Sequence, residues 1–230
     1  MVGKLNYLAQ TRITVHQVAK YSSCPKKEHG NAILYIICYL KRTSNIGLKF
    51  KPNSSKGFED YCDTDFSGNW NCEFAETNPS TAKLRSGWIV FYAGCPIIFA
   101  SKIQSQCTLY TTEAENILFS MSLRDIIPIM MLLEEMKKKS FQVICTNPHV
   151  YCKVLEDNSG ALELAHLPKL HPWTKHVNVC YHHFRGHARK GLLKFFHCST
   201  DLIADALTKP LAQNAFLQHC KEMCGQWASL

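Results

Sequence analysis

The order of strand-like and helix-like patterns after residue 58 constrains the fold of this chain more than any other feature. The run FEDYCDTDF alternates, which places Cys62 on one face of a strand and Asp63 and Asp65 on the other. SGWIVFYAG and CPIIFASK, divided by a Gly-Cys-Pro turn, predict a hairpin, and SQCTLY predicts a third short strand. Next come a long helix from Thr111 or Thr112 toward Lys139, a strand (149–155), helices (158–166 and 177–190), a strand (192–198) and closing helices (201–223). This order predicts an α/β fold in which helices cover a mixed sheet.

The first 45 residues carry a helical pattern instead. One broad apolar stripe within residues 27–43 comprises Ala32, Ile33, Tyr35, Ile36, Tyr39 and Leu40. A turn-rich segment (52–57) follows and marks a boundary. At 230 residues the chain suits one large domain, or one domain of about 150 residues with an appendage.

Four acidic residues lie where a carboxylate is hard to explain as a solvated surface group. Asp63 lies near a strand's end, Glu115 opens the long helix, Asp157 closes a later strand, and Asp205 lies in the apolar turn LIADALTK. Four carboxylates brought together in a cleft cannot all stay ionised without compensating cations. Hard divalent cations such as Mg²⁺ take oxygen ligands. In a chain of net charge +8, such a cluster indicates a metal-dependent enzyme acting on a phosphodiester backbone.

These carboxylates also have structural interpretations. Glu115, at or near the third position of its helix after a threonine N-cap, would complete a capping box. Asp157 is placed to cap the helix that follows it, and Asp63 can be a surface aspartate at a strand end. The alternation of side chains along the strand does not show which of Asp63 and Asp65 is the functional residue, because both lie on one face of the strand. Asp205 has the weakest structural alternative, because the turn around it is apolar.

Composition and termini indicate an intracellular protein. The longest apolar runs, residues 32–40 and 126–133, are shorter than the roughly 18–20 residues of a transmembrane helix, so we expect no membrane partner. The N-terminus MVGKLNYLAQTR lacks a signal-peptide core and cleavage site. Twelve cysteines are scattered without any C-x₂-C pair, so we expect reduced, mostly buried side chains rather than zinc ligands or a disulfide scaffold.

A second charged feature follows the Pro-rich loop LPKLHPW. Lys175, His176, Arg185, Arg189 and Lys190 form the candidate nucleic-acid-binding set, on a basic and partly exposed helix that would contact backbone phosphates. The alternative is ordinary solvated helix charge. His183 and His187 share a helix face, but the glutamate of an H-E-x-x-H zinc motif is absent.

Six motifs in order carry a family resemblance. The motifs YCDTDFSGNW, SGWIVFYAGCPIIFASK, TTEAEN, LEDNSGALELAH, TKHVNVCYHHFR and IADALTKPL resemble the ribonuclease H region of copia-type retrotransposon Pol polyproteins. The segment from VGKLNYLAQTR through KEHGNAILYIICYLKRTSNIGLKF resembles the end of that family's reverse transcriptase and its connection. The resemblance implies a ribonuclease H-like mixed five-stranded sheet flanked by helices over 58–210, a helical reverse transcriptase remnant over 1–50 and a helical tail over 211–230.

The same resemblance implies a function. The catalytic, metal-binding carboxylates of the family map to Asp63, Glu115, Asp157 and Asp205, with Mg²⁺ or Mn²⁺ as cofactor. Asp65 and Glu113 lie next to these positions, either out of register with the family's pattern or in supporting positions. The implied activity is endonucleolytic hydrolysis of the RNA strand of an RNA–DNA hybrid. The implied partners are that hybrid and the rest of Pol, if expressed, in the cytoplasm or in retroelement particles.

Departures from the family's pattern keep an alternative open. The chain reads TRITV where the family has TRPD, Asn116 and Trp173 replace usual residues, and STDLIAD is about one residue short before Asp205. The alternative function is a catalytically decayed remnant that keeps the fold and binds nucleic acid without turnover. A structural domain that depends on the missing polymerase portion is a third interpretation.

Overall fold

Two compact units divide the chain in the computed structural model, which describes residues 18–19, 21–45, 47–65, 83–105, 108, 110–144, 150–166, 178–198 and 203–224. One unit comprises Met1–Leu48 with Trp227–Leu230, and the other comprises Lys49–Gln226. In the first unit, α3 (Lys27–Arg42) confirms the predicted helix, and none of its side chains is fully buried. The predicted boundaries at 50–58 and 210 stay a prediction, although α8 (Gln213–Met223) lies in the larger unit.

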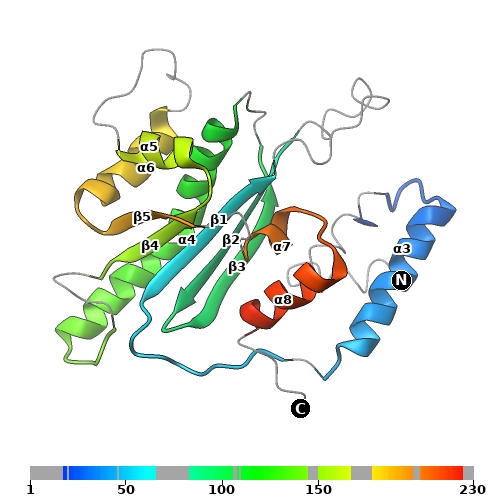
Figure 1. Ribbon diagram of the computed structural model, residues 1–230, viewed down its shortest axis with the longest axis horizontal. Coiled ribbons are helices and arrows are strands. Elements are labelled where there is room, and N and C mark those ends of the chain that lie inside the picture. The colour runs from blue at the N-terminus through cyan, green and yellow to red at the C-terminus, as the bar shows by residue number, and fades with distance from the viewer. Residues whose placement is uncertain are drawn as a thin grey trace. The chain divides into compact units, whose positions relative to one another are not determined.

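The larger unit is built on a five-stranded mixed sheet (Figure 1). Its strands follow the order β3-β2-β1-β4-β5. The pairs β1–β2 and β2–β3 are antiparallel, whereas β1–β4 and β4–β5 are parallel. The strands are β1 (Phe58–Asp65), β2 (Arg85–Tyr92), β3 (Cys95–Ile103), β4 (Cys152–Glu156) and β5 (Leu193–His197). The predicted α/β fold, with a mixed five-stranded sheet whose first three strands are antiparallel, is confirmed.

The hairpin between β2 and β3 turns earlier than predicted. Ala93 and Gly94 both have positive φ, 53° and 73°, and they connect Tyr92 to its partner Cys95. Two consecutive residues with positive φ match the twist of flanking strands, which is why two-residue hairpins favour them. Cys95 and Pro96 therefore begin β3 instead of forming the turn. The strand predicted at 105–110 is not found at the described residues Ser105, Thr108 and Tyr110.

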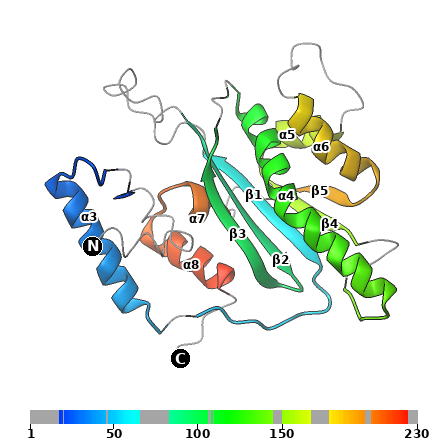
Figure 2. The same ribbon diagram turned by 180° about the vertical axis from the view of Figure 1, so that it is seen from behind.

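Helices cover both faces of this sheet (Figures 1 and 2). The long helix α4 (Thr111–Lys138) packs on β1 and β2, with α5 (Ser159–His166) and α6 (Asn178–Arg189) against it. The short helix α7 (Asp205–Thr208) lies on the other face, against β1, β2 and β3, and α8 packs on α7. Segments far apart in sequence thus meet on the two faces of β1.

The main hydrophobic core lies between α4 and the sheet. Cys62 and its cross-strand partner Trp88 are both fully buried there, which confirms the predicted alternation of β1. Phe119 contacts Phe184 and Phe195 edge to face, with ring centroids 5.7 and 5.2 Å away, so α6 and β5 are joined to α4. Such pairs add about 0.5–1.5 kcal/mol to the burial of each ring.

The cysteines whose side chains the structure describes are reduced thiols outside disulfides, as expected, but only some of them are buried. Cys62, Cys95 and Cys152 are buried, while five others are intermediate or exposed, so the expectation of mostly buried cysteines is wrong for this set. Cys24 and Cys38 are exposed on the first unit.

The helix α4 is long and apolar. Its 28 residues include an 18-residue window of mean hydropathy 1.5, enough by length and composition alone to cross a membrane. Half of that window is buried inside the protein, and the helix packs along β1 and β2. A core helix of a globular domain has this placement and the same composition.

Candidate active site

Asp63 extends from the face of β1 opposite the main core. Its side chain is buried, with 2% of the residue exposed, and Gly87 of β2 is its cross-strand partner. Both carboxylate oxygens are engaged. Lys209 Nζ donates to Oδ1 at 3.0 Å, and the Thr208 hydroxyl donates to Oδ2 in a short hydrogen bond. A carboxylate placed in this way is part of a network rather than a surface strand end.

Asp205 reaches the same place from α7. It is the first residue of this helix, and Lys209 follows one turn later, so the two side chains share a helix face. Lys209 Nζ lies 2.9 Å from Asp205 Oδ1 and therefore joins Asp205 to Asp63. The pKa of Asp205 is raised by burial and by the charges of Asp63 and Asp157, while the hydrogen bond from Lys209 lowers it. The short loop before Asp205 does not direct this residue away from Asp63.

Gly87 permits this approach of α7. A Cβ atom at residue 87 would lie 2.7 Å from Thr208 Cγ2 and 2.8 Å from Leu207 Cβ. Real Cβ atoms essentially never make such contacts, so α7 can lie this close to β2 only over a glycine. The position of Asp205 beside Asp63 therefore depends on a residue of a third element.

Glu115 lies on α4 and does not cap it. The helix begins at Thr111 after Tyr110, which makes no side-chain capping bond, so Glu115 falls in the second turn and the predicted capping box is wrong. The chain enters the helix earlier than the threonine pattern suggested, and Glu113 occupies the third position. Glu115 is only 4% exposed, and its Oε2 has no hydrogen-bond partner among the described residues. Burial, with the charges of Asp63 and Asp157, raises the pKa of Glu115 well above its ordinary range.

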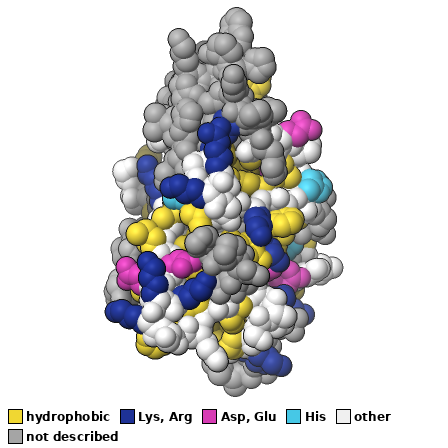
Figure 3. All heavy atoms as spheres, turned by 90° about the vertical axis from the view of Figure 1, so that its left-hand side faces the viewer, with side chains coloured by type: hydrophobic (Ala, Val, Ile, Leu, Met, Phe, Trp, Pro, Cys, Tyr) yellow, Lys and Arg dark blue, Asp and Glu magenta, His cyan; other side chains and the backbone are white. Residues whose placement is uncertain are grey.

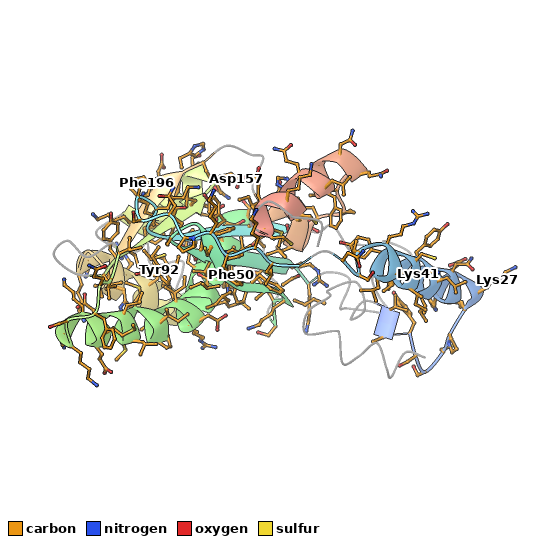
Figure 4. All side chains as sticks on the ribbon, turned by 90° about the horizontal axis from the view of Figure 1, so that it is seen from below. Lys27, Lys41, Phe50, Tyr92, Asp157 and Phe196 are labelled. Carbon is orange, nitrogen blue, oxygen red and sulfur yellow. The ribbon has the colours of Figure 1, made fainter. Side chains whose placement is uncertain are left out.

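Asp157, labelled in Figure 4, follows β4 directly, and its side chain is partly buried. It does not cap α5, because Asn158 Oδ1 accepts the bond from the backbone N–H of Ala161 at 3.2 Å. The preceding residue, Glu156, is fully buried, and its Oε1 accepts a bond from the Asn158 N–H. Burial, Glu115 and Asp157 raise the pKa of Glu156, so a fifth acidic group adjoins the site.

The four predicted carboxylates are therefore electrostatic neighbours. Asp63 lies toward the carboxyl end of β1, and Asp157 follows the end of β4, which runs parallel beside it. No three His, Cys, Asp or Glu side chains within the described parts of the chain are grouped so that they could hold a metal ion as they stand. The oxygen donors and the unpartnered Glu115 Oε2 suit Mg²⁺ or Mn²⁺, but Lys209 occupies the position between Asp63 and Asp205.

The predicted basic surface is only partly described. Lys175 and His176 lie outside the described residues. Arg185 was expected on a partly exposed helix face, but it is buried, with 6% exposed, on a helix that packs against both α4 and β5. Arg189 and Lys190 are exposed at the end of α6. On the face drawn in Figure 3, Lys and Arg side chains are spread among apolar ones rather than gathered in one patch.

Sequence reasoning missed three residues of this site: Thr208, Lys209 and Glu156. The signal for Lys209 was present, because a lysine four residues after Asp205 lies on the same helix face. Thr208 and Glu156 carry no such local signal. Their roles depend on the contact between α7 and β1 and on the burial of the end of β4.

Comparisons with known proteins give a consistent picture, although no family model matches the sequence. The chain is 33% and 32% identical, over 221 residues, to the retrovirus-related Pol polyproteins from transposons RE1 and RE2 of Arabidopsis thaliana. It is 30% identical over 209 residues to that from transposon TNT 1-94 of Nicotiana tabacum. These matches cover 94%, 94% and 90% of the chain, but the chain spans only 14% of the length of each relative.

Solved structures with a similar backbone include the N-terminal RNase H domain of a Mycobacterium tuberculosis protein, at 13% identity and a TM-score of 0.42. That match covers 72% of this chain and 96% of the other. A second is LC11-RNase H1, isolated from compost, at 16% identity and a TM-score of 0.44, covering 71% and 98%. The chain is homologous to copia-type retrotransposon Pol polyproteins, and its larger unit has the mixed, helix-covered five-stranded sheet that was expected of their ribonuclease H region.

Proposed function

We propose that this domain is a metal-dependent endonuclease that hydrolyses the RNA strand of an RNA–DNA hybrid. The observation that carries the proposal is the gathering of buried carboxylates from β1, α4 and α7, one of which, Glu115, has an oxygen without a partner among the described residues. Burying such groups together is unfavourable for folding alone. A site that binds a divalent cation would explain why these carboxylates are buried together.

Asp63, Glu115, Asp157 and Asp205 would hold Mg²⁺ or Mn²⁺. Bound there, a pair of divalent cations would supply activation of an attacking water and stabilisation of the leaving 3′ oxygen. The residues themselves fix the positions of the donor oxygens, because β1 and α4 are core elements. Arg189 and Lys190 would contact backbone phosphates, and 2′-hydroxyl contacts would distinguish the RNA strand. The neighbouring reverse transcriptase of a Pol polyprotein is the proposed covalent partner.

The direct test is cleavage of an end-labelled RNA–DNA hybrid with Mg²⁺. Glu115→Gln and Asp157→Asn are each expected to lower the rate by about 10²–10³-fold, as loss of one group that stabilises charge in a transition state does. Glu135→Gln is the matched control, because Glu135 is an exposed glutamate farther along α4. No cleavage by the wild type, or undiminished cleavage by both site variants, would refute the proposal.

A second candidate function is nucleic-acid binding without turnover. It is favoured by one observation, which is that an ammonium group already bridges Asp63 and Asp205 in a chain of net charge +8. This function predicts binding that weakens steeply with salt and no Mg²⁺ uptake. Calorimetric Mg²⁺ titration of the wild type and of Asp205→Asn separates the two, because only the enzyme shows binding that the substitution weakens.

A further inference from the structure

Lys209 lies at the centre of the candidate site although it is not a carboxylate. Its ammonium contacts Asp63 Oδ1 at 3.0 Å and Asp205 Oδ1 at 2.9 Å. These carboxylates are almost completely buried, with 3% and 9% of their side chains exposed. Lys209 therefore supplies the positive charge that allows two buried acids to lie side by side.

The same contacts compete with a metal ion. Asp63 Oδ2 already accepts a bond from the Thr208 hydroxyl, so Oδ1 is the oxygen that a shared cation would use, and Lys209 holds it. A divalent cation that bridges Asp63 and Asp205 must take these lone pairs from the ammonium. Two positive centres cannot occupy the position together, because like charges at such distances repel strongly in a buried site.

Lys209 has room to leave this position. It follows the last residue of α7, and 35% of its side chain is exposed. Its four-carbon stem is flexible, so the ammonium can exchange carboxylate contacts for water without movement of the backbone. Thr208, in contrast, is buried and fixed by the helix.

We propose that Lys209 is an internal counter-ion that holds Asp63 and Asp205 together in the metal-free protein and is displaced by a divalent cation, so that it sets the affinity for metal. This inference rests on the proposed metal-dependent function, and it adds a residue that opposes binding.

The test compares Mn²⁺ affinity, measured by calorimetry, in the wild type and in Lys209→Met, which keeps the length of the side chain and removes its charge. We expect binding to tighten by about tenfold or more, because Mn²⁺ no longer displaces an ammonium. Lys209→Arg retains the charge and should bind no more tightly than the wild type. Lys153→Met is the matched control, since Lys153 pairs with Glu59 at 3.8 Å on another part of the sheet, and its Mn²⁺ affinity should be unchanged.

Thermal unfolding supplies a second readout. With EDTA, Lys209→Met should unfold at a lower temperature than the wild type, and saturating Mn²⁺ should abolish most of this difference.

Failure of Lys209→Met to fold even with Mn²⁺ overturns the proposal, because the cation would then not replace the ammonium. Mn²⁺ binding by the wild type without tightening in Lys209→Met overturns only the role of Lys209. Absence of binding by both proteins refutes the metal-dependent function as well, whereas binding by the variant alone supports the proposal.

Discussion

Replacing Gly87 with alanine tests how the candidate site is assembled. The new Cβ would lie 2.7 Å from Thr208 Cγ2, 2.8 Å from Leu207 Cβ and 3.4 Å from the Ala204 carbonyl oxygen. The two shortest contacts are with atoms close to the α7 backbone, so rotation of a side chain does not relieve them both. The helix α7 must move away from β2.

The size of the effect follows from these distances. Bringing Thr208 Cγ2 from 2.7 Å to ordinary contact at 3.4 Å moves α7 by about 0.7 Å, and overpacking of this kind costs about 1–3 kcal/mol. A strand alanine is otherwise favoured over glycine by about 0.5–1 kcal/mol, so the net loss should be about 1–2 kcal/mol. The same shift would carry the buried Thr208 away from Asp63 and so weaken the hydrogen bond that the Thr208 hydroxyl donates to Asp63 Oδ2.

Urea unfolding of Gly87→Ala and the wild type measures the loss of stability, and hybrid cleavage measures the effect on the site. Gly186→Ala is the control, because residue 186 is an exposed helical glycine with nothing within 4 Å of an added Cβ. That substitution should stabilise the protein by about 0.5–1 kcal/mol. A Gly87→Ala variant as stable as the wild type would show that α7 does not depend on close contact with β2.

Two further predictions concern buried polar groups. Burial raises the pKa of Asp60 from its ordinary 3.8 to about 7, so the folded protein retains a proton there that the unfolded chain has released. Stability from this group is complete below pH 3.8 and is lost as the pH rises through about 7. Asp60→Asn should therefore lose less stability than the wild type across this range in urea unfolding, and identical pH slopes would contradict the assignment. Gln104 Nε2 donates to Ser86 Oγ at 2.7 Å and to the Ala114 carbonyl at 3.0 Å, which joins β2 to the start of α4. Gln104→Met should cost about 1–3 kcal/mol in the same assay, because it leaves buried acceptors unpaired, and a neutral result would refute this role.

Local patterns determined much of this molecule. The alternation around Cys62 and Asp63 predicted correctly that they lie on opposite faces of the strand, because successive side chains of a strand point to opposite faces, and the structure shows that Cys62 faces the core. The helix-start pattern at Thr111 or Thr112 predicted the long helix α4, and the order of elements predicted the mixed sheet. Periodicity reports on backbone geometry over a few residues, which is why these predictions succeeded.

Other features required the tertiary structure, because they depend on contacts between distant segments. The bond between Lys209 and Asp63 joins residues 146 positions apart, and it exists only because Gly87 lets α7 approach the sheet. Arg185 looks like a surface residue in the sequence, but packing of α6 buries it. The capping role predicted for Glu115 failed because α4 begins earlier and directs this residue into the site. The sequence alone therefore determined which elements form, whereas packing between them decided which charges meet.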